Sequence, residues 1–181
     1  STATPAQNNV VTFAVNNGSY ANYLYNSSSS DPTQTFIATV TPELANIAAG
    51  THWIKFQARR QYSWSPGSVE LGTISDPTDP TTFTPLTTFN LTASYQEYHY
   101  SFVSYSGTDS YIAMRLLVDG TFRRILIDDV EWEPVPECAT PENVTGIDIQ
   151  DISAEIDWTP ISIDSAWFIE LVDLSTSTTT G

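Results

Sequence analysis

The sequence predicts an all-β protein built from antiparallel strands, arranged as a sandwich or jelly roll. Apolar and polar residues alternate with period two in several segments, whereas the 3.6-residue period of amphipathic helices is almost absent. Turn signals rich in Pro, Gly, Asp and Ser separate these segments, at residues 65–67, 75–80, 105–110 and 118–120. Short strands divided by such turns are typical of this fold class.

The clearest alternating segment is THWIKFQARR, residues 51–60. It places Ile54, Phe56 and Ala58 on one face of a strand and the polar residues between them on the other. The segments GSVELGTIS and SYIAMRLLV alternate in the same way. We therefore expect each of these segments to be a strand with one face in the core.

The segment FRRILIDDVEW, residues 122–132, is apolar on both faces through Ile125, Leu126 and Ile127. This pattern predicts a strand in the centre of a sheet, covered on both sides. The segment TPELANIAAG, residues 41–50, permits two interpretations. It is either a short helix capped by Thr41 and ending before Gly50, or a loop with a single turn.

Composition excludes several functions. The chain has 181 residues, with 21 acidic and 6 basic side chains and a formal charge of −15, which repels phosphate backbones. We expect no nucleic-acid partner; divalent cations, neutral glycans and basic partners fit this charge. No apolar run approaches the length of a membrane span, so we expect no membrane insertion. The single Cys138 excludes a disulfide within the chain.

A Pro-rich segment, EPVPECATPEN, divides the chain. Its proline spacing indicates a stiff linker over residues 134–141. We therefore predict a first domain at 1–133 and a second at 142–181. In the second, Ile147, Ile149, Ile152, Ile156 and Trp158 suggest two strands of a sandwich, and about 40 residues are too few for such a domain to close by itself.

The sequence also resembles a known family, in an order that the family shares. The resemblance rests on TPELANIAAGTHWIKFQAR, SVELGTISDPTDPTTFTPLTTFNL, YQEYHYSFVSYSGTDSYIAMRL and RRILIDDVEWEPVPECATPENVTG. These segments resemble the MAM-like jelly rolls of secreted Bacteroidetes surface proteins, also described as cleaved-adhesin or choice-of-anchor-J domains. The resemblance covers residues 35–137. Residues 1–34 match weakly, which leaves the first strand of the jelly roll unassigned. Residues 138–181 resemble the opening of a fibronectin type III domain.

This resemblance is more specific for the fold than for the function, because one fold serves many functions. It implies an antiparallel jelly-roll β-sandwich followed by a partial immunoglobulin-like sandwich of the fibronectin type III kind. The expected function is a non-catalytic adhesion, binding or stalk segment of a large secreted or cell-surface protein, exported by the type 9 secretion system. The alternative is an accessory, carbohydrate-binding-like module of a secreted hydrolase. Expected partners are a glycan or protein ligand on a surface and the neighbouring domains of a longer chain.

Asp128 and Asp129 are adjacent carboxylates at the end of the predicted central strand. Neighbouring strand residues point to opposite faces, which argues against a catalytic pair acting across one glycosidic bond. The resemblance implies a structural calcium ion held by Asp128 first and Asp129 second, through hard oxygen ligands. The alternative is that one carboxylate accepts backbone N–H groups while the other is solvated. Both interpretations remain open.

The segment QYSWSPG supplies the candidate ligand site, because Tyr62 and Trp64 lie outside any alternating pattern. Their rings could stack against sugars, and Arg59 and Arg60 beside them could donate hydrogen bonds to hydroxyls or carboxylates. The alternative, and the more frequent role for sandwich aromatics, is packing. The segment DSA at 164–166 resembles a short O-glycosylation signal, which would place a glycan on Ser165.

We predict no catalytic residues and therefore no enzymatic activity. The chain lacks a G-x-S-x-G elbow, an H-E-x-x-H segment, a P-loop and a G-x-G-x-x-G loop. Its two histidines lie on separate predicted strands without a Cys or His cluster to complete a zinc site.

Overall fold

A computed structural model of the chain describes residues 7–26, 36–118, 122–137, 139–151, 153–161 and 166–168. The chain divides into two compact units, Ser1–Val135 and Pro136–Gly181. The strands of the first unit are β1 (Gln7–Val11), β2 (Ala21–Tyr25), β3 (Ala38–Val40), β4 (His52–Arg60), β5 (Ser68–Ile74), β6 (Phe83–Asn90), β7 (Gln96–Ser101), β8 (Tyr111–Leu116) and β9 (Arg124–Pro134). The second unit contains β10 (Glu142–Ile147) and β11 (Glu155–Thr159). Two short 3₁₀ turns, η1 (Ile47–Ala49) and η2 (Pro80–Thr82), complete the elements.

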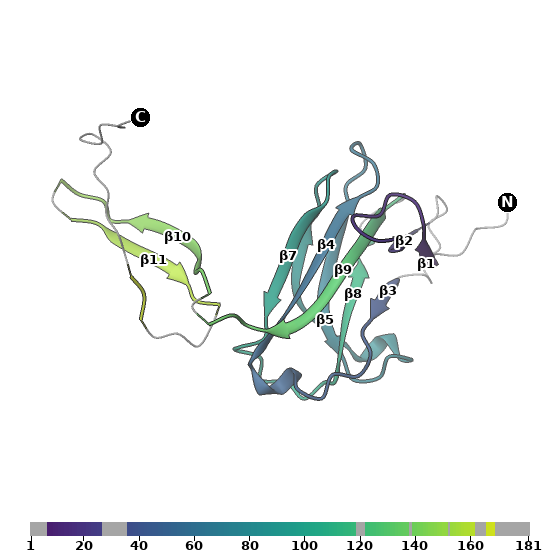
Figure 1. Cartoon of the computed structure of the whole chain (residues 1–181), viewed down its shortest axis with the longest axis horizontal. Coiled ribbons are helices and arrows are strands. Elements are labelled where there is room, and N and C mark those ends of the chain that lie inside the picture. The colour runs from purple at the N-terminus through teal and green to yellow at the C-terminus, as the bar shows by residue number, and fades with distance from the viewer. Residues whose placement is uncertain are drawn as a thin grey trace. The chain divides into compact units, whose positions relative to one another are not determined.

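The first unit is an antiparallel jelly roll (Figure 1). One sheet has the order β1-β2-β9-β4-β7 and the other the order β3-β8-β5-β6. Strands β2 to β9 pass back and forth between the two sheets, with only the β5–β6 hairpin staying in one sheet, as two Greek keys require. The predicted all-β jelly-roll class is confirmed. β2 takes the first position of the jelly roll, which the family resemblance left unassigned, and β1 extends the sheet beyond it.

β4 shows how the alternating pattern forms the core. Ile54, Phe56 and Ala58 are at most 1% exposed, whereas Lys55 and Gln57 between them lie on the outer face. The predicted faces of this strand are therefore confirmed. Burying a side chain such as Ile54 or Phe56 stabilises the fold by about 1.5–3 kcal/mol relative to leaving it in water.

The first half of β9 is buried on both faces, as its apolar run predicts. Ile125 and Ile127 belong to the core between the sheets, while Leu126 between them points to the outer face. All three are fully buried. On the outer face Leu126 packs into a second, smaller cluster whose other members are Ala21, Tyr23, Val11, Val15, Tyr25 and Tyr95. The outer face of the five-stranded sheet is therefore partly covered, and its cover comes from the segment around β1 and β2.

A bulge interrupts the pairing of β4 with β9. Lys55 pairs with Glu131 and Gln57 with Asp128, so that Phe56 faces two residues, Asp129 and Val130. Asp129 adopts a left-handed backbone conformation with φ of 46°, which Asp tolerates better than most residues. Such a bulge bends the strand and changes the direction in which its side chains point.

The segment at 41–50 forms a single turn, η1, rather than a longer helix. Thr41 is not its cap, because the Thr41 Oγ1 accepts a hydrogen bond from the amide of Ile112 at 3.0 Å. Gly50 does end the turn, with φ of 64°. A Cβ at this position would lie 3.0 Å from the carbonyl oxygen of Val103, so both the conformation and the space favour glycine.

The second unit contains an antiparallel pair of strands, β10 and β11. Trp158 on β11 packs edge-to-face against Trp167 with ring centroids 5.4 Å apart. Two antiparallel strands are common to many folds, so the fibronectin type III assignment stays a prediction. Among the described residues, no helix has the length and apolar character that crossing a membrane requires.

The central position of β9 gives a prediction about stability. Replacing Ile127 with Ala should lower the free energy of unfolding by about 2–5 kcal/mol, because the change leaves a cavity in a well-packed core. Urea denaturation of the full chain measures this loss. Val130→Ala on the same strand is the control; its side chain is 39% exposed, and we expect a loss under about 1 kcal/mol. Similar losses for both variants would contradict the described burial of β9.

Candidate functional site

The most exposed aromatic pair of the first unit lies in the loop that follows β4. The rings of Tyr62 and Trp64 stack with centroids 5.0 Å apart and planes 13° apart, and Trp64 is 70% exposed. A tight turn sets this spacing, because the amide of Ser65 donates to the carbonyl of Tyr62 at 3.4 Å. The Ser65 hydroxyl donates to the carbonyl of Phe122 at 3.0 Å and fastens the loop to the chain before β9. The pair is thus held in place although one ring faces solvent.

Arg124, the first residue of β9, completes this arrangement. Its Nη1 donates to the hydroxyl of Tyr62 at 3.2 Å, and its guanidinium carbon lies 5.5 Å from the centre of the Tyr62 ring. Arg124 was not predicted from the sequence. The available signal was the basic pair that precedes the apolar run of β9, but the contact with Tyr62 depends on the pairing of β4 with β9.

Two tyrosines of β2 extend the aromatic surface behind Arg124. Tyr25 pairs with Arg124 across the β2–β9 ladder and stacks on Tyr23 with ring centroids 5.0 Å apart. The Tyr23 hydroxyl donates to Oε1 of Gln61 at 2.7 Å. Burial raises the pKa of Tyr23, and the nearby Arg124 cation opposes this rise, so that the phenol stays protonated at neutral pH. We call the five residues Tyr23, Tyr25, Tyr62, Trp64 and Arg124 the aromatic–arginine patch.

The two other predicted ligand residues, Arg59 and Arg60, lie apart from each other. Arg59 is on the outer face, where its guanidinium carbon lies 5.4 Å from the ring centre of Tyr95 and its Nη1 donates to the carbonyl of Ala93 at 3.3 Å. Arg60 follows the alternation to the inner side, where its Cβ lies beside Gly67. The structure thus brings Tyr62 and Trp64 together, places Arg59 on the same sheet face, and directs Arg60 elsewhere.

Asp128 and Asp129 both bind the loop between β1 and β2. Asp128 is 7% exposed, and its Oδ2 accepts from the amides of Asn16 and Asn17 at 2.7 and 3.3 Å. Its Oδ1 accepts from the amide of Asp129 at 2.9 Å. Asp129 accepts from the Asn16 side-chain amide at 3.0 Å. We expected the two carboxylates to point to opposite faces; the bulge and the left-handed conformation of Asp129 bring both to Asn16.

These contacts are those that the hydrogen-bonding interpretation of the Asp pair expects. The Asp128 carboxylate already accepts three N–H groups, which occupy most of its acceptor positions. In the part of the chain that the structure describes, no group of three His, Cys, Asp or Glu residues is arranged to hold a metal. Calcium at this position stays a prediction from the family resemblance. Ser165, the predicted glycosylation site, lies outside the described residues.

The loop at residues 12–20 covers the middle of the outer face. Besides the contacts to Asp128 and Asp129, the Tyr95 hydroxyl donates to the carbonyl of Ala14 at 2.8 Å. Val15 packs against the cluster around Leu126 and Tyr23. The loop therefore shields the centre of the sheet, and the Tyr62–Trp64 pair stays exposed beyond it.

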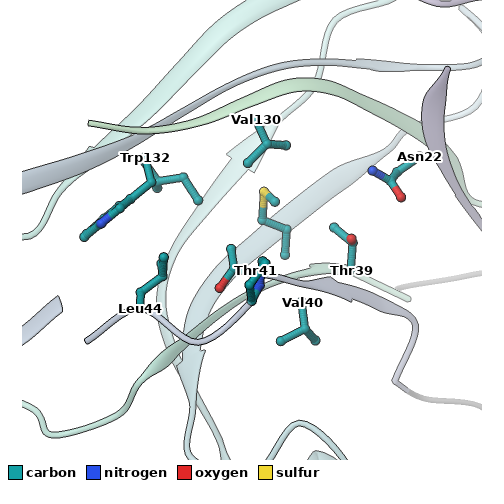
Figure 2. Close-up of a pocket in the computed structure, with 10 residues that line it drawn as sticks. Asn22, Thr39, Val40, Thr41, Leu44, Val130 and Trp132 are labelled. Atoms are coloured by element: carbon teal, nitrogen blue, oxygen red, sulfur yellow. The ribbon is translucent and has the colours of Figure 1, made fainter. Parts of the chain in front are cut away.

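A separate cavity of about 250 Å³ lies between the two sheets (Figure 2). Val130 and Trp132 from β9 line one side of it, and Thr39, Thr41 and Leu44 from the segment around β3 line the other. The cavity lies beside the point where β2 stops pairing with β9, at Asn22 opposite Ile127. Its volume is below the range of about 300–1,000 Å³ typical of ligand pockets, and none of the predicted ligand residues line it.

The jelly roll is similar to solved structures of low sequence identity. The K3 cleaved adhesin domain of Lys-gingipain from Porphyromonas gingivalis W83 is 19% identical with a TM-score of 0.51; the match covers 67% of this chain and 77% of that one. A family 30 carbohydrate-binding module is 10% identical with a TM-score of 0.50, covering 71% and 84%. At these identities the likeness shows a shared fold. No protein-family model matches the chain, and no curated protein matches it.

The contacts of Asp128 give a prediction that separates its two interpretations. Asp128→Asn should lower the free energy of unfolding by about 2 kcal/mol, because hydrogen bonds to a charged group contribute about 1.5–3 kcal/mol. The loss should be the same in EDTA and in millimolar calcium, and hydrogen exchange at Asn16 and Asn17 should speed up. Asp129→Asn, which removes the charge from a group with one bond to Asn16, is the control with a smaller loss. A loss that appears only in calcium would instead support an ion site.

Proposed function

We propose that the jelly roll is a non-catalytic glycan-binding module and that the aromatic–arginine patch is its binding surface. The observation that carries this proposal is the exposed Tyr62–Trp64 stack, anchored through the Tyr62 hydroxyl to Arg124. An exposed indole that serves no core is expected at an interaction site. The similarity of the fold to a cleaved adhesin domain and to a family 30 carbohydrate-binding module supports this proposal.

The patch has the two properties that binding a sugar requires. The Trp64 ring offers a flat apolar surface on which the C–H groups of a pyranose can stack. Arg124, bonded to Tyr62, and Gln61, bonded to Tyr23, add hydrogen-bonding groups to the patch to which sugar hydroxyls would bind. Because the turn at Ser65 and the stack on Tyr62 hold Trp64 in place, little conformational entropy is lost when a ligand binds.

We propose no catalytic role for the carboxylates nearest the patch. Asp128 is buried and accepts hydrogen bonds from the loop at 12–20, so it is not available to a substrate. A glycosidase needs two carboxyl groups facing one bond across an open site. Asp129 is bonded to the side chain of Asn16 beside it and does not provide that arrangement.

The broader setting follows from the family resemblance. We propose a MAM-like or cleaved-adhesin module in a large secreted or surface-exposed protein that is exported by the type 9 secretion system and carries a fibronectin type III domain after the jelly roll. An accessory module of a secreted hydrolase is the second candidate, and the likeness to a family 30 carbohydrate-binding module favours it. The sequence adjoining this chain distinguishes the two: a hydrolase domain indicates an accessory module, and further adhesin repeats indicate an adhesin.

A glycan-binding experiment with matched variants tests the proposal. Trp64→Ala should reduce affinity for a bound glycan at least tenfold, because it removes the exposed stacking ring. Tyr62→Ala should do the same, because it removes the ring that holds Trp64 in place. Isothermal titration calorimetry after screening an array of polysaccharides measures the effect. Trp53→Ala is the control, since Trp53 lies on the same sheet at the end where its indole donates to Glu133 at 3.0 Å.

Equal losses for Trp53→Ala and Trp64→Ala would place binding elsewhere on the sheet. A folded protein that binds no glycan of the array would overturn the proposal in favour of a protein ligand or a stalk role.

A further inference from the structure

We infer that the ligand of this patch is an acidic saccharide, whose negatively charged group pairs with Arg124. The inference rests on the proposed function, because it names the chemical class of ligand for that same surface. It depends on where the few cations of this acidic chain lie and on which groups surround them.

Cations are scarce in this chain, and two described ones are paired with carboxylates. The chain has 6 basic and 21 acidic residues. Lys55 lies between Glu131 and Glu133, with its Nζ 3.1 and 2.9 Å from their carboxylate oxygens. Arg115 is paired with Glu70. In each case the cation and the carboxylates that neutralise it lie on strands of the same sheet.

Arg124 has a different environment. In the described part of the chain no carboxylate pairs with it, and its neighbours are the hydroxyl and ring of Tyr62 and the phenol of Tyr23. Its Nε is buried without a hydrogen-bond partner among the described residues, as is the Nε of Arg60 on the inner side. Arg124 differs from Arg60 in lying beside the exposed Tyr62–Trp64 stack, where its Nη1 is bonded to a neutral phenol. In a chain with more than three acidic residues for each basic one, a cation held by phenols at an exposed aromatic surface indicates that its anion comes from outside.

A second cation lies on the same face. Arg59 pairs with Leu126 across the β4–β9 ladder, and Leu126 is two residues from Arg124 on β9, so that both arginines project from the outer side of the sheet. Arg59 contacts the ring of Tyr95 and the carbonyl of Ala93. Asp128 and Asp129 lie farther along β9. Their negative charges and the cation of Arg59 all act on the pKa of Tyr95, so both carboxylates lie near Arg59. Arg124 is therefore the stronger anion anchor.

The overall charge of −15 does not prevent this binding. At physiological ionic strength the screening length is about 8 Å, so carboxylates on distant parts of the chain act weakly at the patch. An arginine beside an aromatic surface forms a directed, charge-assisted hydrogen bond with a carboxylate or sulfate oxygen. A short acidic oligosaccharide fits this balance better than a long polyanion, whose extra charges would meet the acidic surface.

Matched pairs of oligosaccharides test the inference on the full 181-residue chain. Oligogalacturonides, oligoalginates and hyaluronan oligomers are each compared by calorimetry with their methyl-esterified or carboxyl-reduced counterparts, which keep the backbone and lose the charge. For the backbones that bind, the acidic form should bind about tenfold or more tightly. Arg124→Gln should abolish that difference. Arg115→Gln is the charge-matched control and should preserve it, because Arg115 lies on the other sheet, on β8.

Equal or tighter binding of the neutral form, lost in Trp64→Ala, would overturn the acidic-ligand inference and leave glycan binding intact. The absence of binding to acidic and neutral oligosaccharides alike, and to the wider polysaccharide array, would overturn both. A sulfated counterpart that binds as tightly as the uronate, again only with Arg124 present, would support the inference and show that the site recognises an oxyanion on a sugar rather than a carboxylate alone.

Discussion

The burial of the apolar run of β9 on both faces is the constraint on which the rest of the structure depends. Ile125 and Ile127 fill the core between the sheets, while Leu126 between them needs a cover on the outer face. The loop at 12–20 provides that cover together with Tyr23, and Asp128 holds the loop through its bonds to Asn16 and Asn17. β9 thus supplies side chains to the core between the sheets. Just after its apolar run it also supplies the carboxylate that holds the loop at 12–20 over the outer face.

The same strand determines where a ligand surface is open. The loop shields the middle of the outer face. Phe13 and Tyr20 of the loop are themselves exposed, and beyond the loop Trp64 is exposed at the end where β9 begins. There Arg124 bonds to Tyr62, and Trp64 stacks on Tyr62 with most of its surface in solvent. The cavity between the sheets arises at the opposite part of β9, where β2 no longer pairs with it. An extended glycan fits the open patch, whereas the small, largely apolar cavity is suited to at most a small group.

Local patterns predicted much of the fold and only part of the site. The faces of β4 and the central position of β9 followed from apolar residues at fixed spacing, and Tyr62 and Trp64 were found because they lie outside such a pattern. Arg124 was missed because its role depends on pairing between distant strands. The Asp128–Asn16 contact joins residues 112 positions apart, and a bulge at Asp129 has no signature in the local sequence. The apolar character of Leu126 was the one signal that something must cover the outer face.

The most direct test of the account is an NMR titration of the ¹⁵N-labelled chain with an oligosaccharide that it binds, observed at the indole N–H signals. The first unit has three tryptophans in three different places. Trp64 lies in the patch, Trp53 lies at the end of the sheet where its indole donates to Glu133, and Trp132 lines the cavity and donates to Asn46. Binding at the aromatic–arginine patch should give a saturable shift of the Trp64 signal and small changes in the other two. A dominant shift of Trp132 or Trp53, with Trp64 unchanged, would contradict binding at the patch.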